Sequence, residues 1–415
     1  MENSKISGER ALKFLKEFDF IREAGTDGER KAAGKIREYL EQNIKGEGIS
    51  LRTEEFSFEE NCVGKVYFAV TEPYQKVYPA TGCGNCGSTP TAGVEAPFLY
   101  AELADDISLS GAAGKIVMVS CPVTKELYRK LVQAGAAGFV QISGTPLDTG
   151  EDRVPARRSV RGENSESVQG VTIHYIDAAE LVESGAMKAK LVLQQQKKEK
   201  NSENLILRIE GSDRADEVLT VSAHYDSVPE GPGAYDNMAG AAIVMELCRY
   251  FSVHRPRRTM EFLWFGAEEK GLCGSLAYVR DQAESLEKHR FNMNIDLAGQ
   301  TLGGTVMGVT ADPKVCQILS GYAHEEGLGV SFKNQIWGSD SNSFAWKGIP
   351  AMTLNRDGFG MHTRHDTLAL ISSWSLERSC RLLQTVAERL ANAEVFPFER
   401  EMPEKFIREL DEYFQ

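Results

Sequence analysis

The stretch Val218-Leu-Thr-Val-Ser-Ala-His-Tyr-Asp-Ser-Val-Pro-Glu-Gly-Pro-Gly-Ala-Tyr-Asp-Asn-Met-Ala-Gly240 decides the fold of this 415-residue chain. It opens with an apolar run typical of a buried strand and leads into a predicted helix over residues 237–251. His224 closes the strand, and Asp236 lies just before the helix. In α/β sheets, ligand sites lie at the carboxyl ends of the strands. Both residues are therefore candidates for a functional site.

The same alternation of strand and helix extends outward from this stretch as far as residue 394. Strands are predicted at residues 204–210, 218–224, 259–265, 292–296, 304–309 and 350–355. Helices are predicted at residues 237–251, 271–284, 313–326, 340–347 and 373–394. Such a rhythm predicts an α/β fold with a doubly wound, mostly parallel sheet and helices on both faces.

The earlier part of the chain has a different pattern. Helices are predicted at residues 8–18 and 28–43, and alternating residues over 50–70 indicate strands. A separate, smaller α/β unit follows at 93–192, with strands at 114–121, 139–142 and 170–175, helices at 124–135 and 177–183, and a polar loop over 144–169. We expect residues 1–55 and 196–415 to form one domain, interrupted by an insert over 56–195.

Composition excludes some classes of partner. The net charge is −13 and the pI is near 5.2, whereas a nucleic-acid binder presents a basic face. The first residues lack the apolar core of a signal peptide, and no stretch has the length of a membrane span. We therefore expect a cytoplasmic protein, without membrane association, that is a monomer or a homodimer.

Eight scattered cysteines fit free thiols in such a protein rather than a disulfide framework. Cys83 and Cys86 form a CxxC pair, but no second pair follows at the spacing of a zinc site. We interpret that pair as part of a loop.

Five residues with metal-binding side chains end or follow a predicted strand; they are His224, Asp236, Glu269, Asp296 and His362. In a doubly wound sheet these positions meet at one edge. Two imidazoles and three carboxylates make a nitrogen and oxygen set that suits Zn²⁺, with Co²⁺ or Mn²⁺ as substitutes.

The number of ligands fits two metals. A pair of ions about 3.5–4 Å apart needs a bridging carboxylate and terminal ligands for each ion. A further carboxylate must take a proton from the attacking water and pass it to the leaving amine. Glu268 is adjacent to Glu269 and is the candidate for that role. Asp226, two residues beyond His224, is placed to orient its imidazole.

These residues resemble peptidase family M28, the group that includes aminopeptidase Y and glutamate carboxypeptidase. The matching blocks cover roughly residues 195–395; they are Ser222-Ala-His-Tyr-Asp226, Gly233-Ala-Tyr-Asp-Asn-Met-Ala-Gly240, Phe265-Gly-Ala-Glu-Glu269, Asn294-Ile-Asp-Leu-Ala-Gly299, Ser339-Asp340 and His362-Thr-Arg-His-Asp-Thr367. The resemblance implies a zinc-exopeptidase fold and two zinc ions. Asp236 would bridge the ions, His224 and Asp296 would bind one of them, and Glu269 and His362 would bind the other.

The resemblance also implies roles for residues around the metals. Glu268 would be the general base and then the acid, while Asp226, Asp340 and Asp366 would support the ligands. The peptide between Asp236 and Asn237 would be cis. Two positions depart from the family pattern, since Tyr235 replaces a small or acidic residue and Met361 replaces a frequent tyrosine. A tyrosine near the metals can help to stabilise an oxyanion.

The insert resembles a protease-associated (PA) domain, through Gly114-Lys-Ile-Val-Met-Val119, the alanine-rich stretch 134–139 and Asp177-Ala-Ala179. In the family such inserts can cover the mouth of the active site, and we expect this one to do so.

The activity favoured on these grounds is that of an aminopeptidase acting on peptides. A carboxypeptidase of the glutamate carboxypeptidase kind is an alternative, with Arg356 or Arg364 binding the terminal carboxylate. A single-zinc transferase like glutaminyl cyclase is a third candidate, and a non-catalytic binding protein is a fourth. Side-chain preference depends on loops that the sequence does not place in space.

Overall fold

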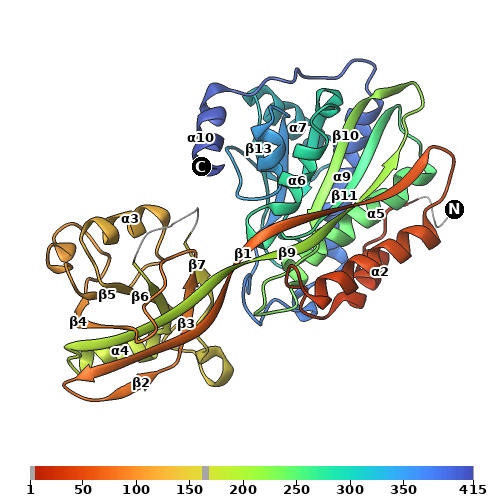
Figure 1. The fold of residues 1–415 in the computed structure, drawn as a ribbon. Coiled ribbons are helices and arrows are strands. Elements are labelled where there is room, and N and C mark those ends of the chain that lie inside the picture. Colours follow the sequence, from red (N-terminus) through yellow and green to blue (C-terminus); the bar gives the residue numbers. More distant parts are fainter. Residues whose placement is uncertain (1–4, 161–167, 415) are drawn as a thin grey trace. The chain divides into compact units, whose positions relative to one another are not determined.

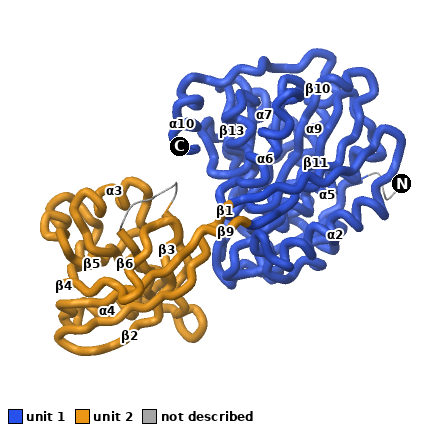
Figure 2. The backbone as a smooth tube through the Cα atoms, in the orientation of Figure 1, with its two compact units in different colours: residues 1–58, 200–415 blue, residues 59–199 orange. Residues whose placement is uncertain are grey.

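A computed structural model describes residues 5–160 and 168–414. The chain divides into two compact units (Figure 2). Unit 1 consists of residues 1–58 and 200–415, and unit 2 of residues 59–199. The predicted limits of the insert were residues 56 and 195.

In unit 1 the strands of the sheet follow in the order β14-β13-β15-β12-β10-β11-β9, and β1 (Ile49–Glu72) pairs with β9. Its strands are β9 (Lys188–Ile209), β10 (Arg214–His224), β11 (Arg258–Phe265), β12 (His289–Ile295), β13 (Thr305–Thr310), β14 (Ser331–Asn334) and β15 (Ala351–Arg356). The central strands β11, β10, β12 and β15 are parallel neighbours. Strands β9 and β13 pair antiparallel to this group, so the sheet is mixed.

Pairing in register brings the carboxyl ends of the central strands to one edge. His224 at the end of β10 pairs with Phe265 at the end of β11. Ile295 at the end of β12 pairs with Leu354, two residues before β15 ends. The residues that follow these strands therefore begin at the same edge of the sheet.

Helices cover both faces of the sheet (Figure 1). One apolar core contains side chains from α1 (Gly8–Leu15), α2 (Asp27–Asn43), α5 (Ala239–Val253), α7 (Pro313–Glu325) and α9 (Ser373–Asn392). A second contains side chains from α6 (Cys273–Asp281), α8 (Ser341–Trp346) and α10 (Glu404–Phe414). Along β11, Phe262 and Trp264 enter the first core while Leu263 and Phe265 enter the second. Alternate residues of a strand face opposite sides, so the two cores lie on opposite faces. The predicted α/β class is confirmed.

Several element boundaries differ from the prediction for local reasons. The helix predicted from residue 237 begins at Ala239, because Asp236 and Asn237 have non-helical backbone angles and are joined by a cis peptide. The cis form is the one that the family resemblance implies. The helix predicted from residue 271 begins at Cys273, since Gly271 and Leu272 have positive φ angles.

The other predicted elements shift by a few residues. The helix predicted over 8–18 ends at Leu15 and continues as a 3-10 turn to Phe18. The strand predicted at 204–210 is the last part of the 22-residue β9, and the alternation over 50–70 belongs to one strand, β1 (Ile49–Glu72). Strand β14 and helix α10 were not predicted.

In unit 2 the strands follow in the order β4-β5-β6-β8-β3-β7, and β4 pairs antiparallel with the first part of β9. Its elements, beside the adjoining parts of β1 and β9, are β2 (Lys76–Tyr78), β3 (Ala80–Gly84), β4 (Val94–Tyr100), β5 (Ile116–Val119), α3 (Lys125–Gln133), β6 (Gly138–Ser143), β7 (Arg158–Ser159), β8 (Gly170–His174) and α4 (Tyr175–Glu183). Its apolar core is separate from those of unit 1. Of the polar loop predicted over 144–169, residues 161–167 lie outside the described residues.

All eight cysteines are free thiols, and Cys83 and Cys86 are buried in unit 2. Across the described residues, none of the groups of metal-binding side chains includes this pair. Within the same residues, no helix is both long enough and apolar enough to cross a bilayer.

Candidate metal centre

The five predicted ligands come from the loops at the carboxyl edge of the sheet in unit 1. His224 is the last residue of β10, and Asp296 directly follows β12. Glu269 lies in the 3-10 turn after β11, and Asp236 in the turn before α5. His362 follows β15 after a short loop and has a positive φ of 57°. Five separate segments therefore contribute one ligand each.

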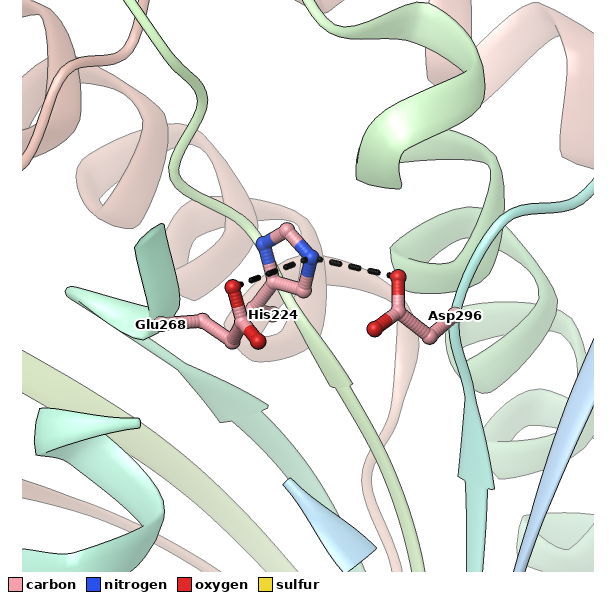
Figure 3. A group of neighbouring side chains, drawn as sticks. All are labelled: His224, Glu268 and Asp296. Atoms are coloured by element: carbon pink, nitrogen blue, oxygen red, sulfur yellow. Dashed lines mark ion pairs between the residues drawn. The ribbon is translucent and has the colours of Figure 1, made fainter. Parts of the chain in front are cut away.

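One group of side chains surrounds the imidazole of His224 (Figure 3). Its Nε2 atom lies 3.5 Å from Asp296 Oδ1 and 3.9 Å from Glu268 Oε2. The same nitrogen lies 3.2 Å from Asp236 Oδ1. The imidazole is 1% exposed, so these carboxylates form its surroundings in place of water.

A second group surrounds His362. Its Nε2 atom lies 3.0 Å from Asp236 Oδ2 and 3.2 Å from Glu269 Oε2. Asp236 thus directs one carboxylate oxygen to each histidine. That is the arrangement expected of a carboxylate shared by two metal ions.

The chemistry of this set fits cations. Both ring nitrogens of His224 and one carboxylate oxygen of Glu269 are buried and have no hydrogen-bond partner among the described residues. Buried polar atoms left unpaired are costly, and four neighbouring carboxylates also repel one another. A divalent ion in each group would bind Nε2 of the histidine there and neutralise the surrounding carboxylates. The mixed nitrogen and oxygen donors suit zinc.

The close packing of buried carboxylates and imidazoles also determines which groups of the metal-free site are protonated. Burial acts to lower the pKa of His362, but hydrogen bonds with Asp236 and Glu269 outweigh burial and raise that pKa to about 11. Burial raises the pKa of Glu269 to about 7, and the charge of Asp236 acts in the same direction. Burial also raises the pKa of Glu268 well above its ordinary value. The metal-free site therefore retains protons at neutral pH.

These shifts predict that metal binding releases protons. Zinc binds neutral imidazole and ionised carboxylate, so each protonated ligand must lose its proton. Because the proton competes with the metal, zinc affinity should rise as pH rises and fall as pH falls. Calorimetric titration of zinc into metal-free protein, in two buffers of different ionisation enthalpy at about pH 7, should show release of roughly one proton or more per ion. A binding enthalpy independent of the buffer would contradict this expectation.

Two carboxylates outside the ligand set position the ligands through the backbone. Asp226 accepts the N–H of Glu268 at 3.0 Å and that of Glu269 at 3.2 Å. Its Oδ1 atom also lies 3.4 Å from Nδ1 of His224, the contact expected of an orienting group. Asp226 therefore contacts three residues of the candidate centre.

Asp366 acts in the same way on the other side of the site. Its two oxygens accept the N–H groups of Tyr235 and Asp236 at 2.6 and 2.9 Å. Asp340 is fully buried beside the site, and burial raises its pKa to about 7. His365 is exposed and belongs to neither group of candidate ligands among the described residues.

The structure also contains a buried arginine that no sequence pattern predicted. Arg22 is 0% exposed and donates from its guanidinium to the carbonyl oxygens of Tyr225 at 2.6 Å and Gly233 at 2.9 Å. It thereby ties together both ends of the loop that leads from His224 to Asp236. No motif surrounds Arg22, and only its contacts reveal the role.

The two departures from the family pattern have distinct surroundings. Tyr235 is buried, and its hydroxyl donates to the carbonyl oxygen of Arg356. Met361 is 47% exposed next to His362.

Comparison with known proteins identifies the domain that carries this centre. Residues 204–387 match the model of Peptidase family M28. Aminopeptidase YwaD of Bacillus subtilis is 31% identical over 220 residues, which are 51% of this chain and 46% of that protein. The vacuolar membrane protease of Saccharomyces cerevisiae is 34% identical over 134 residues, or 32% of this chain and 13% of that protein. The matches thus span about half or less of these relatives.

Solved structures match nearly the whole chain. The zinc aminopeptidase BSAP from Bacillus subtilis superposes with a TM-score of 0.80 at 21% identity, covering 97% of this chain and 99% of that one. An aminopeptidase from Aneurinibacillus sp. strain AM-1 gives a TM-score of 0.75 at 21% identity, covering 96% and 97%. At this identity the likeness shows the fold, which both units of the chain share with these structures.

Proposed function

We propose that this chain, whose residues 204–387 are a peptidase family M28 domain, is an aminopeptidase that holds two zinc ions. One observation carries the proposal: the carboxylate of Asp236 lies between His224 and His362, with one oxygen 3.0–3.2 Å from each ring. Asp236 would be shared by both ions. His224 and Asp296 would complete one site, and Glu269 and His362 the other.

Glu268 is the proposed general base. Bound zinc supplies Lewis-acid activation of the scissile carbonyl and of the attacking water. Glu268 shares the first group with His224 and Asp296. If Asp236, 3.2 Å from the same imidazole, supplies the third ligand of that site, the carboxylate of Glu268 is left to act as the base. It would take a proton from the attacking water and deliver it to the leaving amine.

The surroundings of Arg356 exclude one of the two arginines that a carboxypeptidase could use, the other being Arg364. Its guanidinium is buried and donates to the carbonyl oxygens of Gln300 at 2.7 Å and Thr301 at 3.0 Å, and to the Thr305 hydroxyl at 3.1 Å. A group so engaged is not available to bind a terminal carboxylate. The excess of acidic side chains at the centre, in contrast, favours a protonated α-amine.

A single-zinc transferase and a non-catalytic binding protein fit the centre less well. The transferase needs one group of ligands, whereas this chain presents two groups, and Asp236 of the second group also lies 3.2 Å from His224 of the first. A binding protein descended from a peptidase would have lost ligands or the base, and this chain retains all of them.

The assignment of unit 2 to the PA class is likewise a proposal, supported by the motifs quoted above.

Substrate selectivity tests the proposed direction of attack. The zinc-loaded chain should hydrolyse an aminoacyl p-nitroanilide with a free amine. It should act at least ~10²-fold more slowly on the N-acetylated anilide. A site that binds a charged amine discriminates strongly against a substrate that lacks this group. A peptide with a blocked amine and a C-terminal glutamate is the counterpart probe. Release of glutamate from that peptide at a higher rate than hydrolysis of the free-amine anilide would overturn the aminopeptidase assignment.

A further inference from the structure

The turn between β11 and α6 carries the proposed base, and side chains from other segments hold its backbone. Asp226 binds the N–H groups of Glu268 and Glu269, as described above. The two preceding N–H groups, those of Gly266 and Ala267, are also bound by side chains. Four consecutive backbone donors are therefore held by groups outside the turn.

Glu29 and Asn204 are the acceptors for those two preceding groups. Ala267 N donates to Glu29 Oε1 at 3.2 Å, and Gly266 N donates to Asn204 Oδ1 at 3.3 Å. Asn204 also donates to the carbonyl oxygen of Gly274 at 2.9 Å, on the far side of the turn. Ala267 has a positive φ of 54°, a conformation that a non-glycine residue adopts only when its surroundings impose it.

Both carboxylate oxygens of Glu29 accept hydrogen bonds, which hold its side chain in place. It lies in α2, is 1% exposed, and accepts from Gly25 N at 2.6 Å and from the Ser202 hydroxyl at 2.6 Å. A Cβ at Gly266 would collide with Ser202 Oγ and would lie 2.9 Å from Glu29 Oε1. Glycine at position 266 thus allows the turn to approach this carboxylate closely.

We propose that Glu29 is a positioning residue for the general base: through the N–H of Ala267 it fixes the turn that aims the carboxylate of Glu268. This inference rests on the proposed function. The hydrogen bonds of Glu29 within the described residues run to Gly25, Ser202 and Ala267, none of which is a proposed metal ligand. Glu29 also lies outside the stretch that matches the family model. Its side chain is a hydrogen-bond acceptor and has no part in the chemistry.

The role requires an acceptor at both oxygens of Glu29. The Oε1 atom faces the Ala267 N–H and the Ser202 hydroxyl, and the Oε2 atom faces the Gly25 N–H. Glutamine in its place would turn an amide NH₂ toward one of these donors. Alanine would leave the Ala267 N–H without its acceptor. Either change allows the turn to shift, and displacements near 1 Å can cost about 100-fold in rate.

A double-mutant cycle separates positioning from a general loss of structure. Glu29→Ala and Glu29→Gln are each made in the wild-type chain and in the Glu268→Gln chain, with zinc loaded. Glu38→Gln, on the exposed surface of the same helix, is the matched control. The measurements are kcat and KM on an aminoacyl p-nitroanilide, zinc per chain, and thermal unfolding.

In the wild-type background, Glu29→Ala should lower kcat by about 10–100-fold, and Glu29→Gln by a smaller factor, with KM and zinc content little changed. In the Glu268→Gln background neither change should lower the residual rate further, because their effect passes through Glu268. Glu38→Gln should match the wild type in both backgrounds.

Three outcomes overturn the proposal. They are a wild-type kcat in Glu29→Ala, an equal loss of rate in both backgrounds, and a loss of kcat that only follows the fraction of unfolded protein. If Glu29→Ala fails to fold, the same three outcomes are judged on Glu29→Gln instead. A wild-type kcat in Glu29→Gln then overturns the proposal. A zinc-loaded wild type without activity, or one unaffected by Glu268→Gln, would instead overturn the proposed function.

Discussion

Replacing Glu268 by glutamine should lower kcat by about 10²–10⁴-fold, the usual contribution of a general base. The substitution preserves shape and removes only the ability to accept a proton. Because Glu268 is not one of the proposed metal ligands, the zinc content should remain that of the wild type. The measurements are kcat on an aminoacyl p-nitroanilide and zinc per chain by elemental analysis.

The matched control for this change is Glu284→Gln. Glu284 lies on the exposed surface after α6, so the same chemical change there should leave kcat unaltered. A Glu268→Gln protein that retains two zinc ions and about half or more of the wild-type kcat would remove Glu268 from the mechanism.

The second large effect is expected at the shared carboxylate. Asp236→Asn keeps the size of the side chain but replaces one ligand oxygen by an NH₂ group that cannot bind metal. One of the two ions then loses its contact with residue 236. We expect zinc affinity to fall by about 100-fold or more at one site, and activity to fall with it. Competition with a chelator of known affinity measures the first effect and kcat measures the second.

Asp281→Asn is the control for this substitution. Asp281 forms an ion pair with its neighbour Arg280 at an exposed position, so its loss should change neither zinc affinity nor kcat. If Asp236→Asn binds two zinc ions with wild-type affinity, Asp236 is not the bridge.

The residues of the site were predictable because each follows a strand that its own sequence reveals. Apolar runs such as 218–223 identify the strands, and parallel pairing aligns their ends. His224 and Asp296, 72 residues apart, therefore had to approach one another once both strands joined one sheet. The family resemblance added the order of the ligands and the cis peptide before Asn237.

Contacts that depend on tertiary packing were not predictable. Glu29 and Ala267 are separated by 238 residues, and a single glutamate in a helix is most often exposed. The burial of Arg22 could not be predicted either, because no sequence motif surrounds it. The strand β14 was missed because it is short and partly polar, and α10 lies beyond the region where strands and helices alternate, although Phe406 and Leu410 are spaced as on one helical face.

The number of zinc ions bound by each chain tests the central claim most directly. Metal-free protein is titrated with zinc, and bound metal and kcat are measured at each addition. Two groups of ligands that share Asp236 predict about two ions per chain, with full activity only when both are bound. Saturation at one ion, with full activity at that point, would contradict the account and favour a single-zinc enzyme.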